Sequence, residues 1–466
     1  MILLNVIIKP VWIFGIDRQV QIQVGANVYG KYFALISLAF IFNILLDIGI
    51  TNYANRNIAT NNILLPYIMG NSLVAKFFLS ILYAVILVII AMGSGINNVK
   101  LLLILILLQI LSSLLLFGRG VVSALQLFKT DAFLSIIDKA LLIIVAGVWL
   151  YMPYFKKQFD IYEFAWMQVV TIGVTIIICC IVLAGKKAFA NIKFDKKGAS
   201  KIIMQSIPFA LTVFFMGMHN RTDAFLLERL HSNGAQEAGV YASAYRLLDA
   251  ANMLGYLFAT ILISYWSKLA SEKPVIQKSL SFSHQLLIPT GILLASAAVI
   301  LNKPLYYLLY HHTNSYAEEI LQWCLITVVP YFITHIYGTL LTAVGKIKSF
   351  MRIVLLCAII NVTANVIAIP LWGAKACVLI GLCSQSLLAV LSIIAVKRET
   401  GHGVRTSLWF KYLLIAVITV CSFILLNKLD ISVWAKLIAA ALIWVAAMNV
   451  LQIFSIRSFL KLMSEK

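Results

Sequence analysis

The chain has 466 residues, of which 62% are hydrophobic and only 12% are charged, and its mean hydropathy is +0.97. A water-soluble domain carries about 25% charged residues, so this composition excludes an ordinary soluble protein. The formal net charge of +20 could suggest a nucleic-acid partner, but Lys and Arg gather at the ends of apolar runs. We interpret them as charges that orient the chain in a membrane, and we expect no nucleic-acid partner.

Apolar runs long enough to cross a bilayer recur along the whole chain. A spanning helix needs about 20 mostly apolar residues, and runs of this length without period-two alternation predict helices rather than a β-barrel. We therefore expect an all-α polytopic membrane protein with about 14 transmembrane helices. In chain order, the predicted spans are 1–16, 31–50, 69–92, 101–118, 132–152, 163–184, 202–226, 239–266, 280–301, 319–343, 349–370, 373–396, 408–426 and 432–455.

The first predicted span is short, because Asp17 and Arg18 follow it so closely. Either this span is tilted and kinked at Pro10, or native residues precede Met1. Lys9 and the absence of a small-residue cleavage site argue against a cleavable signal peptide.

The most polar connection, residues 185–201, lies between the sixth and seventh predicted spans. We interpret it as a basic cytoplasmic linker. It would join an N-terminal six-helix lobe, 1–184, to a C-terminal six-helix lobe, 202–396. Residues 397–466 would then form helices 13 and 14 and a basic tail.

A weak internal repeat supports two related halves. Residues 25–37 (GANVYGKYFALIS) enter the second span much as residues 234–249 (GAQEAGVYASAYRLLD) enter the eighth, with Val28-Tyr29 matching Val240-Tyr241. Repeats of this kind are common in transporters.

Lys and Arg are unequally shared between the loops. If the N-terminus is cytoplasmic, the cytoplasmic segments hold 22 of these residues and the opposite segments hold 9. The bias predicts that both termini are cytoplasmic, which agrees with an even number of spans.

Charged residues within the spans are the candidates for function, because a charge near the bilayer centre costs about 2.5–3.5 kcal/mol. Arg246 and Asp249 share a face of the eighth span and either line a cavity or form a structural ion pair. In the seventh span, Arg221 and Asp223 point to different faces; they either cap the end of the helix or face a lumen.

Further candidates lie near the ends of earlier spans. Lys76 in the third span, and Asp138 with Lys139 in the fifth, either reach the surface by snorkelling or face a cavity. Asp47 ends the second span and is followed by Arg56, whose guanidinium suits a phosphate group; an ordinary interfacial loop is the alternative.

Other polar features predict no catalytic chemistry. His311-His312 lies beside three tyrosines and indicates an aromatic belt rather than a metal site. The seven cysteines lie in apolar stretches, where Cys behaves as a small hydrophobic residue. No P-loop, G-x-S-x-G, H-E-x-x-H or C-x-x-C motif occurs. We expect no disulfide, metal site, cofactor or enzymatic activity, and no ATP-driven transport by this chain itself.

Residues 8–61, residues 220–253 and the basic linker resemble polysaccharide flippases of the Wzx type. These flippases belong to the multidrug/oligosaccharidyl-lipid/polysaccharide exporter superfamily, with the lipid II flippase and the multidrug and toxin extrusion transporters. The resemblance implies two six-helix lobes that form a V around a central cavity and work by alternating access. The short first helix departs from the family pattern.

The resemblance also implies a substrate, which is an undecaprenyl-pyrophosphate-linked oligosaccharide for O-antigen, lipopolysaccharide or capsule synthesis in a bacterial cytoplasmic membrane. The headgroup would pass through the cavity while the lipid tail stays among membrane lipids, where helices 13 and 14 would hold it. A polymerase and a chain-length regulator of the same pathway would be candidate partners.

Site roles are carried over as expectations. The cations expected to contact the headgroup are Arg56 and Arg246, followed by Arg18, Lys76, Lys139 and Arg221. Carboxyl groups in a low-dielectric cavity can bind protons near neutral pH, and those expected to couple transport to protons or ions are Asp47, Asp138, Asp223 and Asp249.

Two other functions remain open: a drug/cation antiporter or lipid II flippase of the same superfamily, and a membrane-embedded glycan polymerase or glycosyltransferase. A cationic-drug extruder would need acidic cavity residues without matching basic ones, whereas here the basic ones at least equal the acidic ones. The longest loops, of about 17 residues, are too short for the extramembrane domain that such an enzyme usually carries.

Overall fold

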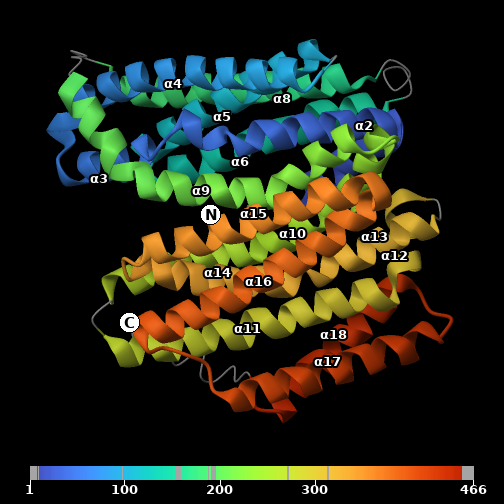
Figure 1. Ribbon diagram of the computed structural model, residues 1–466. Helices are drawn as coiled ribbons and strands as arrows, with labels where there is room; N and C mark the ends of the chain where they lie inside the picture. The colour runs from blue at the N-terminus through green and yellow to red at the C-terminus, as the bar shows by residue number, and fades with distance from the viewer. Residues whose placement is uncertain are drawn as a thin grey trace. The chain divides into compact units, whose positions relative to one another are not determined.

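The computed structural model describes residues 8, 10–96, 98–152, 159–186, 188–189, 196–269, 272–311 and 314–453; the side chains of residues 56, 196–209 and 268 lie outside that description. Within these ranges the chain forms helices and connecting loops and contains no strand (Figure 1). The predicted all-α fold class is confirmed.

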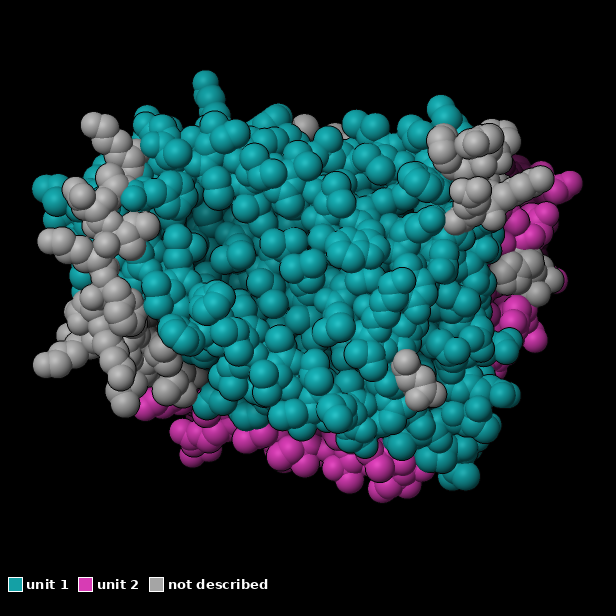
Figure 2. Space-filling model, turned by 90° about the horizontal axis from the view of Figure 1, so that it is seen from above, with its two compact units in different colours: residues 1–239, 369–373 teal, residues 240–368, 374–466 magenta. Residues whose placement is uncertain are grey.

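The chain divides into two compact units, coloured separately in Figure 2. Unit 1 comprises residues 1–239 and 369–373, and unit 2 comprises residues 240–368 and 374–466. The predicted boundary at the 185–201 linker stays a prediction.

Helices of unit 1 follow one another with short connections. They are η1 (Val11–Asp17, a π-helix), α2 (Arg18–Ile41), η2 (Asn43–Leu46, a 3₁₀-helix), α3 (Ile50–Thr60), η3 (Asn62–Leu64), α4 (Leu65–Gly93), α5 (Val99–Ala124), α6 (Phe128–Tyr151), α8 (Ile161–Gly185) and α9 (Lys196–Leu230).

Two helices contribute residues to both units, namely α10 (Gly234–Lys268) and α15 (Ile347–Trp372). Unit 2 also contains α11 (Lys273–Ile300), α12 (Asn302–Tyr310), α13 (Ser315–Ile326), α14 (Val328–Ala343), α16 (Ala374–Thr400), α17 (Thr406–Asn427) and α18 (Val433–Val450).

Among the described residues, twelve helical stretches are long and apolar enough to cross a membrane. Eleven of them each coincide with one predicted span. The twelfth, Val11–Ile41, contains both the first and the second predicted spans. The span predicted at 202–226 lies in α9, which is outside the twelve. The chain is a multi-pass membrane protein.

The stretch Val11–Ile41 consists of two segments that meet at Gly25. This glycine has φ 79° and ψ 161°, a backbone conformation available essentially to glycine alone. The hydroxyl of Tyr29 donates a hydrogen bond of 2.7 Å to the carboxylate of Asp17, although twelve residues of straight helix would separate them by about 18 Å. The chain therefore turns back at Gly25.

The predicted end of the first span at residue 16 was wrong, because the helix continues through Asp17 and Arg18 to the turn at Gly25. Hydropathy alone places two charges outside the span. In the structure Asp17 is buried and bonded to Tyr29, so its charge does not end the helix.

The second predicted span, 31–50, was wrong beyond residue 41. Regular α-helix ends at Ile41, and α3 begins only at Ile50. Between them, Ile48 and Gly49 both have positive φ, of 39° and 82°. We refer to residues 42–49 as the break.

Within unit 1, α2 packs closely on α9 and on the first residues of α10. A Cβ atom on Gly30 would lie 1.8 Å from the carbonyl oxygen of Ala235, and one on Gly239 would lie 2.0 Å from that of Ala26. Two Ala-x-x-x-Gly motifs, 26–30 and 235–239, thus cross reciprocally, as small residues permit between membrane helices. These motifs lie in the two segments that form the internal repeat.

Loop contacts within each unit agree with alternating spans. In unit 1, Arg229 donates to the carbonyls of Ser94 and Gly95, each at 3.1 Å, so the connections after the third and seventh predicted spans meet. In unit 2, Lys375 at the start of α16 pairs with Glu319 in the first turns of α13 at 2.6 Å, so the helix ends that follow the ninth and eleventh predicted spans meet. Which side is cytoplasmic stays a prediction.

In unit 2, α17 and α18 lie beside α11 (Figure 1). The indole of Trp444 donates to the carbonyl of Pro289 at 3.1 Å, and Phe423 packs in a buried cluster with Ala297 and Ala440. The predicted helices 13 and 14 are therefore attached to the body of unit 2.

Candidate functional site

The candidate site of unit 1 surrounds the ammonium group of Lys76, a residue of α4 that is only 1% exposed. Its Nζ lies 2.8 Å from Oδ1 of Asp47 and 3.0 Å from the carbonyl oxygen of Leu46. On α5, the hydroxyl of Ser113 is 2.7 Å away and the carbonyl oxygen of the same residue 3.4 Å away. One ammonium group thus connects the break to α4 and α5.

The break exposes the groups that Lys76 binds. In a continuous α-helix the N–H of Ile50 would bond to the carbonyl of Leu46; here it bonds to the carbonyl of Asp47, at 2.8 Å. The carbonyl of Leu46 is left to accept from Lys76 and from the hydroxyl of Ser113, the latter at 3.1 Å. An interrupted membrane helix is tolerated where such groups find partners inside the protein.

The carboxylate of Asp47 also bonds to the first turn of α3. It accepts hydrogen bonds from the hydroxyl of Thr51 at 2.5 Å and from the backbone N–H of the same residue at 3.3 Å. Negative charge is favourable at a helix N-terminus. Asp47 therefore links Lys76 to the first turn of the helix that carries Arg56.

Two further polar contacts join the break and α2 to the neighbouring helices α5 and α4. The amide of Asn43, in the break, donates to Gln109 at 3.0 Å. The hydroxyl of Tyr83 donates to the carbonyl of Ala39 at 2.9 Å. Interrupted helices with exposed carbonyls are the usual construction of transporter binding sites.

The structure brings Asp47 and Lys76 together, and Lys76 does not snorkel. The other early pair, Asp138 and Lys139 on α6, forms an ion pair of 3.3 Å. The ammonium of Lys139 also lies 5.2 Å from the ring centroid of Trp12, within range of a cation–π interaction.

The remaining candidates occupy separate places. Arg221 on α9 lies over the ring of Phe40, at 5.4 Å, and Asp223 is buried in the same helix. The half-buried Arg18 follows Asp17 at the start of α2. Arg246 and Asp249, both half-buried, lie on the part of α10 in unit 2. Arg56 lies on α3, and its side chain is outside the described part of the structure.

The partners of these charges were not predicted from the sequence. Gln109, Ser112 and Ser113 are the only polar side chains between Lys100 and Arg119 in α5. Their isolation in an apolar run indicates side chains with polar partners inside the protein. The bond between Asp17 and Tyr29 was not predicted either, although Gly25, a residue type that permits a turn, lies between them in the sequence.

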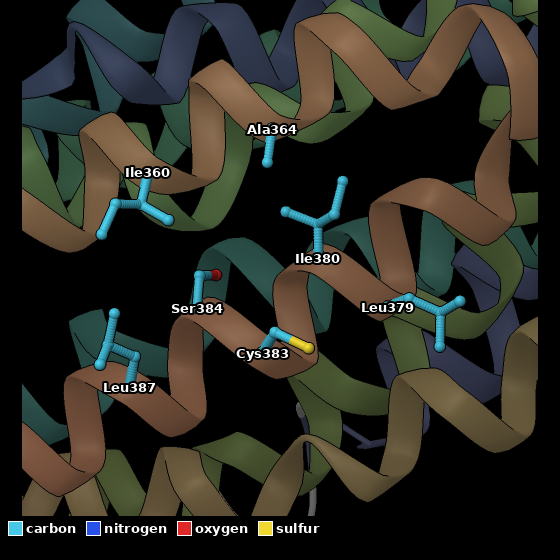
Figure 3. Close-up of a pocket in the computed structure, with 7 residues that line it drawn as sticks. All are labelled: Ile360, Ala364, Leu379, Ile380, Cys383, Ser384 and Leu387. Carbon is cyan, nitrogen blue, oxygen red and sulfur yellow. The ribbon is translucent and has the colours of Figure 1, made fainter.

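Unit 2 contains a cavity of about 250 Å³ between α15 and α16 (Figure 3). It is lined by Ile360, Ala364, Leu379, Ile380, Cys383, Ser384 and Leu387. Ser384 accepts a hydrogen bond of 3.1 Å from Asn361, which is buried. With no charged lining residue, the cavity does not suit a pyrophosphate.

The helices, the break and the buried charges describe a membrane protein of the transporter class. Residues 19–270, more than half of the chain, match the family described as polysaccharide biosynthesis protein. The chain belongs to this family. None of the curated proteins compared with it matches.

Solved structures share the fold. The lipid II flippase MurJ in an inward closed conformation matches with a TM-score of 0.72 at 15% identity, over 97% of this chain and 98% of that one. An inward-facing multidrug resistance transporter of the MATE family matches with a TM-score of 0.65 at 12% identity, over 84% and 96%. Identities this low establish the fold alone. The resemblance inferred from the sequence, to flippases of this superfamily, is confirmed by the family and the fold.

A third structure is a MOP superfamily transporter from Pyrococcus furiosus, with a TM-score of 0.57 at 14% identity over 85% of this chain and 91% of that one. The reversed polarity of its binding pocket is described as suggesting a different function.

Proposed function

We propose that the protein is a flippase that carries an undecaprenyl-pyrophosphate-linked oligosaccharide across the bacterial cytoplasmic membrane for surface polysaccharide synthesis, as in O-antigen or capsule. The observation that carries the proposal is that a polysaccharide biosynthesis family sequence folds along 97% of its length like a lipid II flippase. The chain would work by alternating access and is not an enzyme.

The charges of the candidate residues support an anionic headgroup. Arg is well suited to phosphate, because its planar guanidinium donates several hydrogen bonds at once. We propose Arg56 and Arg246 as the main headgroup contacts, with Arg18, Lys139 and Arg221 as further cations.

Lys76 is a different case, since its donors are directed at oxygens of the protein itself. Among the carboxylates, Asp138, Asp223 and Asp249 are the candidates for coupling to protons or ions. Asp47 is committed to Lys76 and Thr51 in this conformation.

Deletion of the gene in its host tests the proposal. We expect loss of surface glycan, with complete lipid-linked repeat units trapped on the cytoplasmic side. Single repeat units on the outer face without polymer would favour a glycan polymerase, and unchanged glycan with altered drug tolerance would favour a drug/cation antiporter.

Complementation tests the site. Wild type should restore the glycan and Arg246→Ala should not, although that variant accumulates in the membrane. Arg398→Ala is the matched control, because Arg398 is exposed at the end of α16; it should complement like wild type. Normal glycan with Arg246→Ala would remove Arg246 from the mechanism.

A further inference from the structure

The surroundings of the Lys76 ammonium group form a cage of oxygen atoms. Four oxygens lie within 3.4 Å of Nζ: the carbonyls of Leu46 and Ser113, the Ser113 hydroxyl and one carboxylate oxygen of Asp47. Leu46 and Asp47 lie in the break and Ser113 lies on α5, so the cage forms only when the break packs against α5. Both Lys76 and Ser113 are buried.

The cage has the composition of a binding site for a small cation. Hard cations take carboxylate, carbonyl and hydroxyl oxygens as ligands. In transporters, carbonyls from interrupted helices coordinate alkali ions. An ammonium group is close in size to a potassium ion and donates three hydrogen bonds, so Lys76 can satisfy the same set of oxygens.

We propose that this cage is a monovalent-cation site that the chain fills with its own ammonium group. Lys76 is then a positioning residue: it neutralises Asp47, occupies the carbonyl that the break leaves unbonded and fixes the start of α3. Without its side chain, the cage would bind a potassium or sodium ion in the same place. The proposal concerns unit 1 only and holds whatever substrate the protein carries.

A simple ion pair is the competing explanation. In that case Lys76 only neutralises the carboxylate of Asp47, which lies 2.8 Å away. The three uncharged oxygens then contribute nothing to the binding of the ammonium group. Both explanations predict that Lys76→Ala is destabilised. Only the cage predicts that dissolved potassium or sodium restores the lost stability.

Three variants separate the two explanations. Lys76→Ala empties the cage and leaves room for an ion. Lys76→Met is the matched control, because its unbranched side chain fills most of the space without a charge. Lys76→Ala/Asp47→Asn leaves room but removes the anionic ligand.

The measurement is the thermal unfolding midpoint of each purified variant and of wild type, in potassium, sodium or choline chloride at constant total salt. Choline is too large for the cage. We expect the midpoint of Lys76→Ala to be lowest in choline and to rise by about 2 °C for each tenfold increase in potassium or sodium. The other three proteins should respond equally to all three salts.

Equal midpoints for Lys76→Ala in choline, potassium and sodium would overturn the proposal in favour of the ion pair. So would an alkali-ion response of the same size in Lys76→Met or in the double variant. Failure of Lys76→Ala to accumulate in cells at any salt concentration also overturns it, because the empty cage then recruits no ion.

Discussion

Replacement of Gly30 by alanine tests the close crossing of α2 with the start of α10. The added Cβ would lie 1.8 Å from the carbonyl oxygen of Ala235 and 2.6 Å from the amide nitrogen of Gly239. Both are backbone atoms and no side chain can move aside, so the two segments must separate by about 1 Å. Overpacking of this kind costs about 1–3 kcal/mol, whereas the gain in helix propensity is about 0.5–1 kcal/mol.

Gly173→Ala is the matched control, because Gly173 lies inside α8 and a Cβ there would meet no atom within 4 Å. We expect Gly30→Ala to be less stable than wild type by about 0.5–2 kcal/mol and Gly173→Ala to be more stable by about 0.5–1 kcal/mol. Unfolding titrations with SDS in mixed micelles measure both. If the two substitutions change stability by the same amount, the crossing at Gly30 is not a close contact.

Two further contacts give sharp expectations. Tyr29→Phe removes the hydrogen-bond donor to buried Asp17 and should lower the free energy of unfolding by about 2 kcal/mol. Tyr83→Phe removes a bond to a neutral carbonyl and should lower it by about 1 kcal/mol. Equal values from the same SDS titration would show that the Asp17 bond has no special strength. Trp444→Phe should weaken the packing of α18 on α11 and speed protease cleavage between α17 and α18. Trp434→Phe, at a residue that is 62% exposed, should not. Equal cleavage of the two variants would show that the Trp444 bond does not hold α18.

The positions of most membrane spans could be predicted from the sequence, because the thickness of the bilayer requires long apolar runs. The ends of the first two spans could not. Hydropathy treats Asp17 as a boundary, since it counts the charge and not the hydrogen bond that the hydroxyl of Tyr29 donates to the carboxylate. Gly49 was visible after Asp47, but glycine within an apolar run predicts close packing as readily as an interruption.

The charged residues of the site could also be identified from the sequence, but which of them form pairs could not. Asp47 and Lys76 are 29 positions apart, and hydropathy gives only the depth of each along its own helix. Their contact depends on the break, which turns Asp47 toward α4. Ser113 was missed because Ser and Thr in membrane helices usually bond to their own backbone or to a neighbouring helix.

The contacts of Lys76 in the structure also argue against a role in binding an anionic substrate. By composition alone, a lysine in a span near other charges is a candidate for an anionic substrate. Its donors instead meet the oxygens of Leu46, Asp47 and Ser113. The arginines Arg56 and Arg246 therefore remain the principal candidates for the headgroup.

Movement of a lipid-linked oligosaccharide by the purified protein tests the central proposal most directly. Vesicles would carry an undecaprenyl-pyrophosphate oligosaccharide with a fluorescent sugar, and a membrane-impermeant quencher would report how much label reaches the outer leaflet. We expect label from the inner leaflet to become quenchable faster with wild type than in protein-free vesicles, and Arg246→Ala to resemble the protein-free vesicles. Equal rates with and without the protein, in vesicles where it moves lipid II or a cationic dye, would contradict the proposed function.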